Sequence, residues 1–223
     1  MNINVISNIR FILLALGFCI ASNQAWAITD ISACGVINKP GSYRVTRDMT
    51  HFTSRVSSQC ILIEANDVTL DLQGHTITGD GSGSGITVSG NTSLSNIEVR
   101  NGTVKSFETG VYMLEVKGAH IERMRVHDNS NIGILVENHE LPDVGAIIID
   151  NVAYENFTGI NVGSDSLVRG NVTNYNRFAG ISVLCPSLVS DNVANNNGDG
   201  KNNIFRPRSS CIYSNNVPPI IFK

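Results

Sequence analysis

Charged side chains in the first half of the chain are the residues best suited to chemistry. Asp71, Glu98 and Glu122 occupy what we predict to be equivalent outward positions in three successive repeats, with Arg100 and Arg125 nearby. Stacked carboxylates repel unless a cation or a basic side chain lies between them. Carboxylate oxygens bind Ca²⁺, so this set could hold Ca²⁺ or a sugar. We favour a solvated face of alternating ion pairs, and we expect no other cofactor or metal.

Tyr112 is the best single candidate for a carbohydrate contact, because strand alternation places its ring outside and aromatic rings can stack on sugars. It belongs to a series of outward residues, one in each repeat: Thr87, Tyr112, Leu135, Asn161 and Ser182. A lyase acting on an acidic polysaccharide needs carboxylates for Ca²⁺ and a base for the proton beside the uronate carboxyl. The series contains neither, which argues against lyase chemistry on that face.

Two further groups have structural interpretations that we prefer. Three aromatic residues precede glycines of the repeat by two or three positions, which predicts an internal stack and not a platform for sugars: Phe107, Phe157 and Phe178. The longest segment between predicted strands carries side chains that could bind a metal or act as acid and base: Glu137, His139, Glu140 and Asp143. Their spacing matches no known site, so we expect a polar loop.

Four cysteines follow the N-terminal apolar segment: Cys34, Cys60, Cys185 and Cys211. An even number in an exported chain indicates two disulfides. Three pairings are possible, and the sequence-local one joins residues 26 apart, which would staple adjacent repeats at each end. A metal site is the less favoured alternative, since there is no Cys-x-x-Cys pair. The five histidines, at positions 51, 75, 120, 127 and 139, are too scattered to predict a copper site.

Residues 1–27 are typical of a cleaved signal peptide, with a basic Arg10, an apolar run over 11–20 and the cleavage pattern Ala25-Trp26-Ala27. A lipid anchor at Cys19 is the less favoured alternative. We therefore expect a secreted or periplasmic protein with no membrane span. Cleavage would leave 15 basic and 19 acidic residues, a net charge of −4. This balance argues against a nucleic-acid partner, which would need a basic surface.

The element that must position these residues is a repeat. Gly-Ile-x-Val or a close variant begins at glycines 85, 110, 133, 159 and 180, with spacings of 25, 23, 26 and 21 residues. Short alternating segments at such a period predict an all-β solenoid, a single-stranded right-handed parallel β-helix of about six to seven coils. We expect an N-terminal cap and first strand over 28–59, the repeats over 60–197 and a C-terminal cap over 198–223.

Asparagines mark the corners of the predicted coils. Asn151, Asn171 and Asn192 recur at spacings of 20 and 21 residues, and a second set follows them at positions 129, 156, 176 and 197. Stacked coils would place these amides in ladders with a spacing of about 4.8 Å. The residues at 156 and 171 also begin glycosylation sequons, but the regular spacing favours the ladders.

The repeats over 34–197, and above all Val68-Thr69-Leu70-Asp71-Leu72-Gln73-Gly74-His75-Thr76-Ile77-Thr78-Gly79, resemble the pectin-lyase-like superfamily of right-handed β-helix proteins. The resemblance implies the fold and leaves the activity open, because that superfamily includes polysaccharide lyases, glycoside hydrolases, uronate epimerases and a periplasmic family associated with maturation of nitrous oxide reductase. The polygalacturonase signatures are absent. The epimerase signature Asp-Pro-His-Asp is approached only at Val126-His127-Asp128-Asn129, which lacks the leading Asp-Pro.

These observations predict a non-catalytic β-helix that binds extracellular or cell-envelope polysaccharide. One alternative is a polysaccharide lyase, glycoside hydrolase or uronate epimerase with an unrecognised site. Another is a periplasmic accessory or structural repeat protein that binds protein or metal. Small size weighs against the enzyme, since catalytic β-helices usually have more coils and longer loops.

Overall fold

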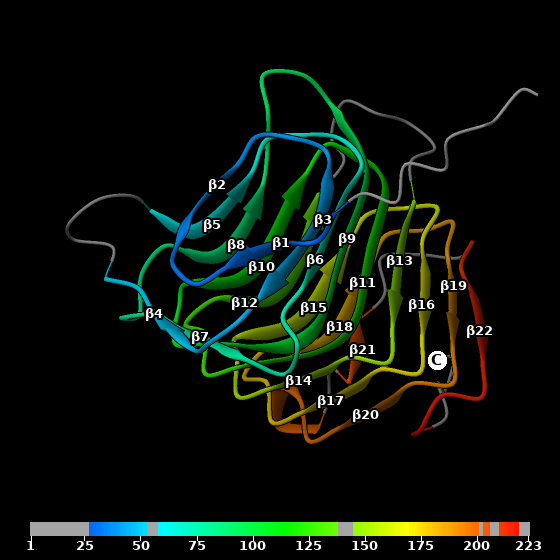
Figure 1. Ribbon diagram of the computed structural model, residues 1–223. Helices are drawn as coiled ribbons and strands as arrows, with labels where there is room; N and C mark the ends of the chain where they lie inside the picture. Colours follow the sequence, from blue (N-terminus) through cyan, green and yellow to red (C-terminus); the bar gives the residue numbers. More distant parts are fainter. Residues whose placement is uncertain (1–26, 53–57, 138–144, 201–202, 206–209, 219–223) are drawn as a thin grey trace, which may run out of the picture.

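The computed structural model describes residues 27–52, 58–137, 145–200, 203–205 and 210–218. The chain winds into a stack of coils, and each coil contributes strands to a small and a large parallel sheet (Figure 1). The small sheet has the order β2 (Gly35–Ile37), β5 (Gln59–Ile63), β8 (Ser84–Val88), β10 (Thr109–Leu114), β12 (Ile132–Glu137), β15 (Thr158–Val162), β18 (Ala179–Val183) and β21 (Ile204–Phe205).

The large sheet forms the other wall of the stack. Its main row is β1 (Thr29–Ile31), β3 (Gly41–Val45), β6 (Val68–Asp71), β9 (Leu94–Lys105), β11 (Val116–His127), β13 (Ala146–Ile149), β16 (Leu167–Arg169), β19 (Leu188–Ser190) and β22 (Ile212–Ser214). Beyond the bend in β9 and β11 the sheet continues with β4 (Met49–Thr50), β7 (Thr76–Thr78), β14 (Val152–Tyr154), β17 (Val172–Asn174) and β20 (Val193–Asn195). The predicted parallel β-helix is confirmed, with about seven coils.

Strand alternation separates a dry interior from the outer surface. In the small sheet, one inward residue from each coil stacks in register on the next, and none is exposed to solvent: Ile86, Val111, Ile134, Ile160 and Ile181. Burial of each such side chain stabilises the fold by about 1.5–3 kcal/mol relative to exposure. Within the described residues there is no α-helix, and no helix has the length and hydropathy to cross a bilayer.

The predicted asparagine ladder is present at a corner of the large sheet. The Nδ2 atoms of Asn151 and Asn171 each donate to the Oδ1 of the next asparagine at 3.0 Å, and Asn192 continues the ladder to Asn216 at the same distance. Asn151, Asn171 and Asn192 are fully buried, so the sequon at Asn171 is not a glycosylation site. The residue before each asparagine has a positive φ (Asp150, Gly170 and Asp191), which turns the amide inward.

The second ladder runs through the next corner and explains the repeated glycine. Asn156 donates to Asn176 at 3.0 Å, and Asn176 donates to Asn197 at 2.8 Å. A Cβ atom on Gly159 would lie 2.8 Å from the Nδ2 of Asn176 and 2.6 Å from the carbonyl oxygen of Gly180. The close approach between ladder and strand therefore favours glycine at positions 110, 133, 159 and 180, whereas at Gly85 the closest atom belongs to Val104.

The predicted internal stack of three phenylalanines is wrong for two of them. Phe107 is fully buried, and its N–H donates to the Oδ1 of Asn129 at the end of the second ladder. Phe157 and Phe178 are 42% and 40% exposed and stack on each other at 5.4 Å. Phe107 precedes its glycine by three residues, whereas Phe157 and Phe178 precede theirs by only two. This difference of one residue places their rings outside.

Both sequence-local disulfides are present. Cys34 is bonded to Cys60, and Cys185 is bonded to Cys211. The Cα–Cα distances are 4.6 and 4.9 Å, close to the distance of about 4.8 Å between neighbouring strands of a sheet. Each bond therefore joins neighbouring coils, one near each end of the stack.

Replacement of a ladder residue should be costly. Asn171→Ala removes the acceptor for Asn151 and the donor to Asn192 and to two carbonyl oxygens. All but one of these bonds are buried, so we expect the free energy of unfolding to fall by about 3 kcal/mol. Urea denaturation measures the change. Asn91→Ala, at an exposed position, is the control and should change stability by less than about 0.5 kcal/mol. Equal effects of the two substitutions would contradict the structural role of the ladder.

Reduction of the disulfides should lower the melting temperature. Each closes a loop between residues 26 apart, which in the chain-entropy treatment stabilises a fold by about 3 kcal/mol. For a chain of this size, that loss corresponds to roughly 6–12 °C for each bond. A melting curve recorded by circular dichroism with and without excess reductant checks the prediction, and coincident curves would contradict it.

Candidate ligand-binding site on the large sheet

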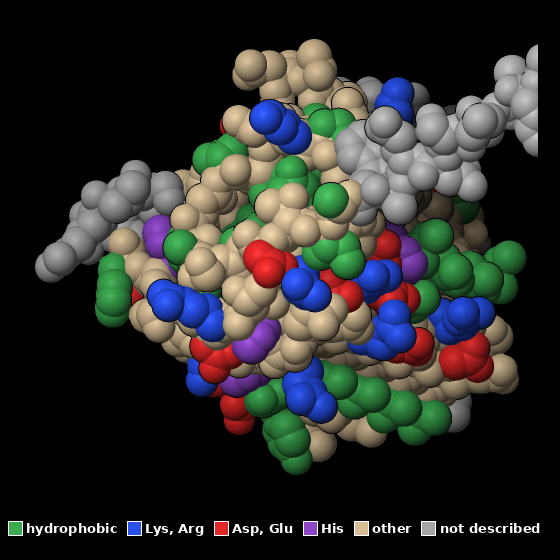
Figure 2. All heavy atoms as spheres, in the orientation of Figure 1, with side chains coloured by type: hydrophobic (Ala, Val, Ile, Leu, Met, Phe, Trp, Pro, Cys, Tyr) green, Lys and Arg blue, Asp and Glu red, His purple; other side chains and the backbone are tan. Residues whose placement is uncertain are grey.

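Five of the six candidate residues lie together on the outer face of the large sheet. Asp71 ends β6, Glu98 and Arg100 lie on β9, and Glu122 and Arg125 lie on β11. Figure 2 shows charged side chains gathered over these strands, with hydrophobic side chains over the strands that follow. The sequence therefore identified a real cluster, formed by three neighbouring strands.

The expected column of three carboxylates is wrong. In the register of the large sheet, Asp71 lies opposite Arg100, and Arg100 lies opposite Glu122. Glu98 lies two residues earlier on β9 and is opposite His120. Residues two apart point to the same face of a strand, so the outward face of Glu98 was predicted correctly. Its alignment with Asp71 and Glu122 was not, because Arg100 lies between them. The column alternates in charge, which removes the repulsion that stacked carboxylates would have.

Arg100 links two of the carboxylates. Its Nε donates to Asp71 Oδ2 and its Nη1 donates to Glu98 Oε1, both at 2.9 Å. Asn101 Nδ2 donates to the same Asp71 oxygen at 3.1 Å. In the next coil, Glu122 accepts from Arg123. These bonds already neutralise the carboxylates that were candidates for Ca²⁺.

The surroundings of Asp71 determine its protonation. Burial raises the pKa of this carboxyl, but hydrogen bonds from the Gln73 N–H, Arg100 and Asn101, with the charge of Arg100, outweigh it and hold the pKa below its ordinary value. Asp71 is therefore an ionised acceptor in an ion pair. A general acid needs the opposite shift, toward a raised pKa.

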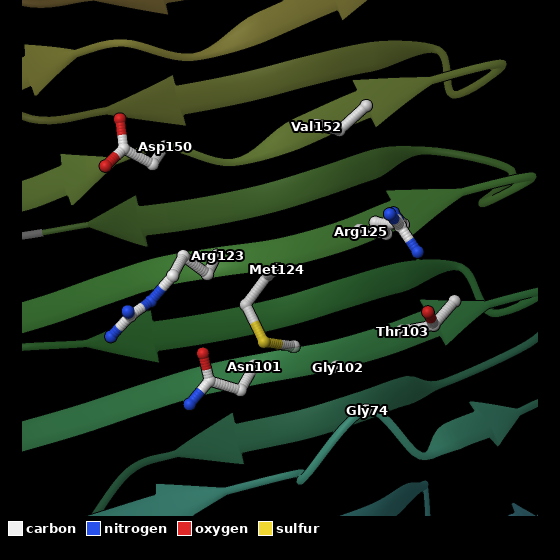
Figure 3. A pocket seen from close by; sticks show the side chains of 9 residues that line it. All are labelled: Gly74, Asn101, Gly102, Thr103, Arg123, Met124, Arg125, Asp150 and Val152. Carbon is white, nitrogen blue, oxygen red and sulfur yellow. The ribbon is translucent and has the colours of Figure 1, made fainter.

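A polar hollow lies beside the charged column, where the long strands bend (Figure 3). It is lined by Gly74, Asn101, Gly102, Thr103, Arg123, Met124, Arg125, Asp150 and Val152. Arg123 and Arg125 are exposed and lie on either side of Met124 in β11. Arg125 makes no side-chain hydrogen bond or ion pair with the described residues, so its guanidinium group is available to an anionic ligand.

Tyr112 lies apart from this cluster, on β10 of the small sheet. Its hydroxyl donates to Glu137 Oε2 at 3.1 Å. Burial, this hydrogen bond and the charges of Glu137 and Glu115 raise the pKa of Tyr112 to about 12. The ring is half-buried between Thr87 and Leu135 of the neighbouring coils. Three other residues proposed for a loop site lie outside the described residues: His139, Glu140 and Asp143.

Sequence reasoning missed one member of the cluster, His120. His120 Nε2 lies 3.7 Å from Glu122 Oε2, and Arg123 contacts the same carboxylate. His120 and Glu122 lie two residues apart on β11, so both point to the same face of the strand. The local alternation of the sequence could therefore have found this pair.

The sequence matches the family described as "Periplasmic copper-binding protein (NosD)" over residues 64–217. The chain belongs to the NosD family. No curated protein matches it significantly. Among solved structures, the A-module of mannuronan C-5 epimerase AlgE4 from Azotobacter vinelandii is similar, with a TM-score of 0.55 and 21% sequence identity. The similarity covers 71% of this chain and only 50% of that module, and at this identity it shows the fold alone.

The NosD family name implies copper, which soft donors such as thiolate and thioether, and also imidazole, bind in proteins. Among the His, Cys, Asp and Glu residues that the structure describes, one group has its ligand atoms within 4.8 Å of one another: Cys34, His51 and Cys60. Its two sulfur atoms are bonded to each other. A disulfide is not a thiolate ligand, so in this oxidised form the group does not fit a copper ion.

The lowered pKa of Asp71 predicts a pH-dependent contribution to stability. The contribution is present above the ordinary pKa of 3.8 and is lost as the pH falls through the lower pKa of the folded state. Asp71→Asn should therefore lower the free energy of unfolding at pH 7, and this loss should shrink at about pH 2. Urea denaturation at both pH values measures it.

The matched control is Asp165→Asn, at an exposed position on the last coils. It should change stability little at either pH. A loss at Asp71→Asn that is equally large at the two pH values would contradict the assignment of an ionised, hydrogen-bonded carboxylate.

Proposed function

We propose that this NosD-family protein binds an acidic polysaccharide of the cell envelope on the outer face of its large sheet, without cleaving it. The observation that supports this most is the hollow beside Arg123 and Arg125. Guanidinium groups form paired, charge-assisted hydrogen bonds with carboxylates, which uronate sugars carry. Asn101 and Thr103 line the same hollow and offer hydrogen-bonding groups for hydroxyls.

The carboxylates of the cluster support binding more than cleavage. Glycoside hydrolysis needs two carboxyl groups on opposite sides of the scissile bond, one of them protonated. Asp71 and Glu98 share Arg100, and the pKa of Asp71 is lowered. Ionised groups held in this way serve as acceptors for sugar hydroxyls and as anchors for the arginine.

A second candidate function is proton abstraction from a uronate, as in an epimerase or lyase. His120 and Glu122, 3.7 Å apart and beside Arg123, favour it. An imidazole can take the proton beside a carboxyl group that an arginine holds. The structural similarity to an epimerase module concerns the fold alone and identifies no residue of this candidate site.

The periplasm is the compartment that we propose for this protein. The family is described as periplasmic, and two disulfides fit an oxidising compartment. Export through a signal peptide over residues 1–27 stays a prediction, since residues 1–26 lie outside the described residues.

Binding can be tested on an array of acidic and neutral polysaccharides. The protein should be retained by at least one uronate-containing polymer, and retention should weaken with salt. Arg123→Ala/Arg125→Ala should lower the affinity at least about tenfold, equivalent to 1.4 kcal/mol. Lys39→Ala/Arg47→Ala removes the same charge at exposed positions outside the charged column and should retain the affinity. Equal losses in the two variants would contradict a site at the hollow.

The same array distinguishes binding from catalysis. Reducing-end counts, absorbance of unsaturated uronates and the ratio of uronate epimers should all stay unchanged. Product that is abolished by Glu98→Ala, Glu122→Ala or His120→Ala would overturn the binding proposal in favour of the enzyme.

A further inference from the structure

We propose that the polysaccharide lies parallel to the solenoid axis, along a line of outward polar side chains beside the hollow. This line, the polar row, takes one residue from each of six neighbouring strands: Thr78, Lys105, His127, Tyr154, Asn174 and Asn195. The inference rests on the proposed function, because it extends the ligand that Arg123 and Arg125 hold. It assigns the direction of the bound chain and a second subsite at Lys105, His127 and Tyr154.

The register of the large sheet places the polar row next to the hollow. Figure 3 shows Thr103, Arg125 and Val152 in line on successive strands, and all three line the hollow. On the same strands, the members of the polar row follow these residues by two positions. Residues two apart on a strand point to the same face and lie about 6.6 Å from each other. A sugar held in the hollow therefore has its neighbour in the chain within reach of the polar row.

Hydrogen-bonding side chains occupy the whole polar row, and all its members are half-buried. The neighbouring line instead changes after Arg125 to Val152, Val172 and Val193. On the main row of strands, the later coils expose apolar side chains such as Leu188. A polymer rich in hydroxyl groups therefore finds its partners in these coils along the polar row.

Parallel pairing makes the polar row regular. Neighbouring strands lie about 4.8 Å apart, so the five intervals of the row span roughly 24 Å. The repeat of an extended pyranose chain is close to the distance between strands, so successive sugars can meet successive coils. A chain laid along one strand would meet only two outward residues, because the strands after the bend are three residues long. The geometry therefore favours a chain that crosses the strands.

His127 and Tyr154 form the centre of the second subsite. Their rings stack between coils, with centroids 4.5 Å apart and an angle of 9° between the planes. The Nδ1 of His127 lies 2.8 Å from Asp128 Oδ2, which fixes the imidazole and leaves Nε2 for a ligand. Burial and the charges of Asp128 and Glu155 raise the pKa of Tyr154, although the charge of Arg125 lowers it. The hydroxyl therefore stays protonated and can donate to a carboxylate.

Charge selects the part of the polymer that binds at this end of the row. Lys105 is half-buried, and within the described residues its ammonium group has no ion-pair partner. It lies opposite His127, with Arg125 two residues earlier on the same strand as the histidine. The two cations fit neighbouring carboxylates of a polyuronate, whereas the asparagines at the other end of the row fit hydroxyls. The exposed Asp128 and Glu155 follow the row at the corner and repel an acidic chain there.

The test uses the full chain with dimers and hexamers of galacturonate and of mannuronate, and calorimetry measures each affinity. Lys105→Ala/Tyr154→Phe should lower the affinity for both lengths at least about tenfold, the loss expected when a hydrogen bond to a charged group is removed. The phenylalanine keeps the ring stack on His127. Lys117→Ala, at an exposed position near the start of β11, is the control and should retain both affinities.

The asparagines test the direction of the chain. A hexamer reaches Asn174 and Asn195, whereas a dimer held at the hollow does not. Asn174→Ala/Asn195→Ala should therefore lower the affinity for the hexamer about fivefold and leave the affinity for the dimer unchanged. Carbodiimide coupling of the wild-type protein to the hexamer, read by mass spectrometry, needs no variant to fold. It should form an amide bond between a uronate carboxyl and Lys105, and none with Lys117.

Equal affinities of the polar-row variants and the control would overturn the inference, as would coupling at Lys117 in place of Lys105. If Arg123→Ala/Arg125→Ala still loses binding in that case, the proposed function stands and the polar row alone is rejected. A wild-type protein that binds neither the oligomers nor any polymer of the array would reject both.

Discussion

Parallel main-chain pairing between successive coils decides which side chains meet. Each strand lies directly over the strand of the previous coil, so every inward position becomes an apolar row and every corner asparagine becomes part of a ladder. Inside the solenoid, water cannot satisfy the corner amides. Asn171 Nδ2 donates to Asn192 and to the carbonyl oxygens of Ile148 and Arg169. These bonds fix the corners. Leaving a buried amide unpaired would cost more free energy than a contact on the outer surface contributes.

The same pairing explains how far the sequence could predict the structure. Inward and outward faces, the two ladders and the disulfides follow from local alternation and from spacing that recurs. The row occupied by Asp71, Glu98 and Glu122 could not be predicted, because segments between strands differ in length from coil to coil. Arg100 lies 29 residues after its partner Asp71, whereas Asn171 follows Asn151 by 20. A shift of two residues keeps the face and changes every contact on it.

The outer face of the large sheet changes character along the solenoid axis. Its first coils carry alternating charge, from Asp30 and Arg44 through Asp71 and Arg100 to Glu122. The later coils instead present an apolar row on the neighbouring line: Ile147, Leu167, Leu188 and Ile212. Arg169 on β16 is a guanidinium group that these later coils expose on this face, whereas Arg123 and Arg125 lie beside the hollow. We place the proposed site at the bend of β9 and β11, because two arginines lie beside a hollow there.

The N-terminal disulfide illustrates how main-chain pairing alone holds neighbouring coils together. A bond between neighbouring paired strands adds little to their local geometry, since the backbone already holds the two Cα atoms at strand spacing. Its main contribution is to the entropy of the unfolded chain. Opening such a bond therefore lowers global stability without dispersing the residues around it. A disulfide that closed an unpaired loop would instead release its cysteines on reduction.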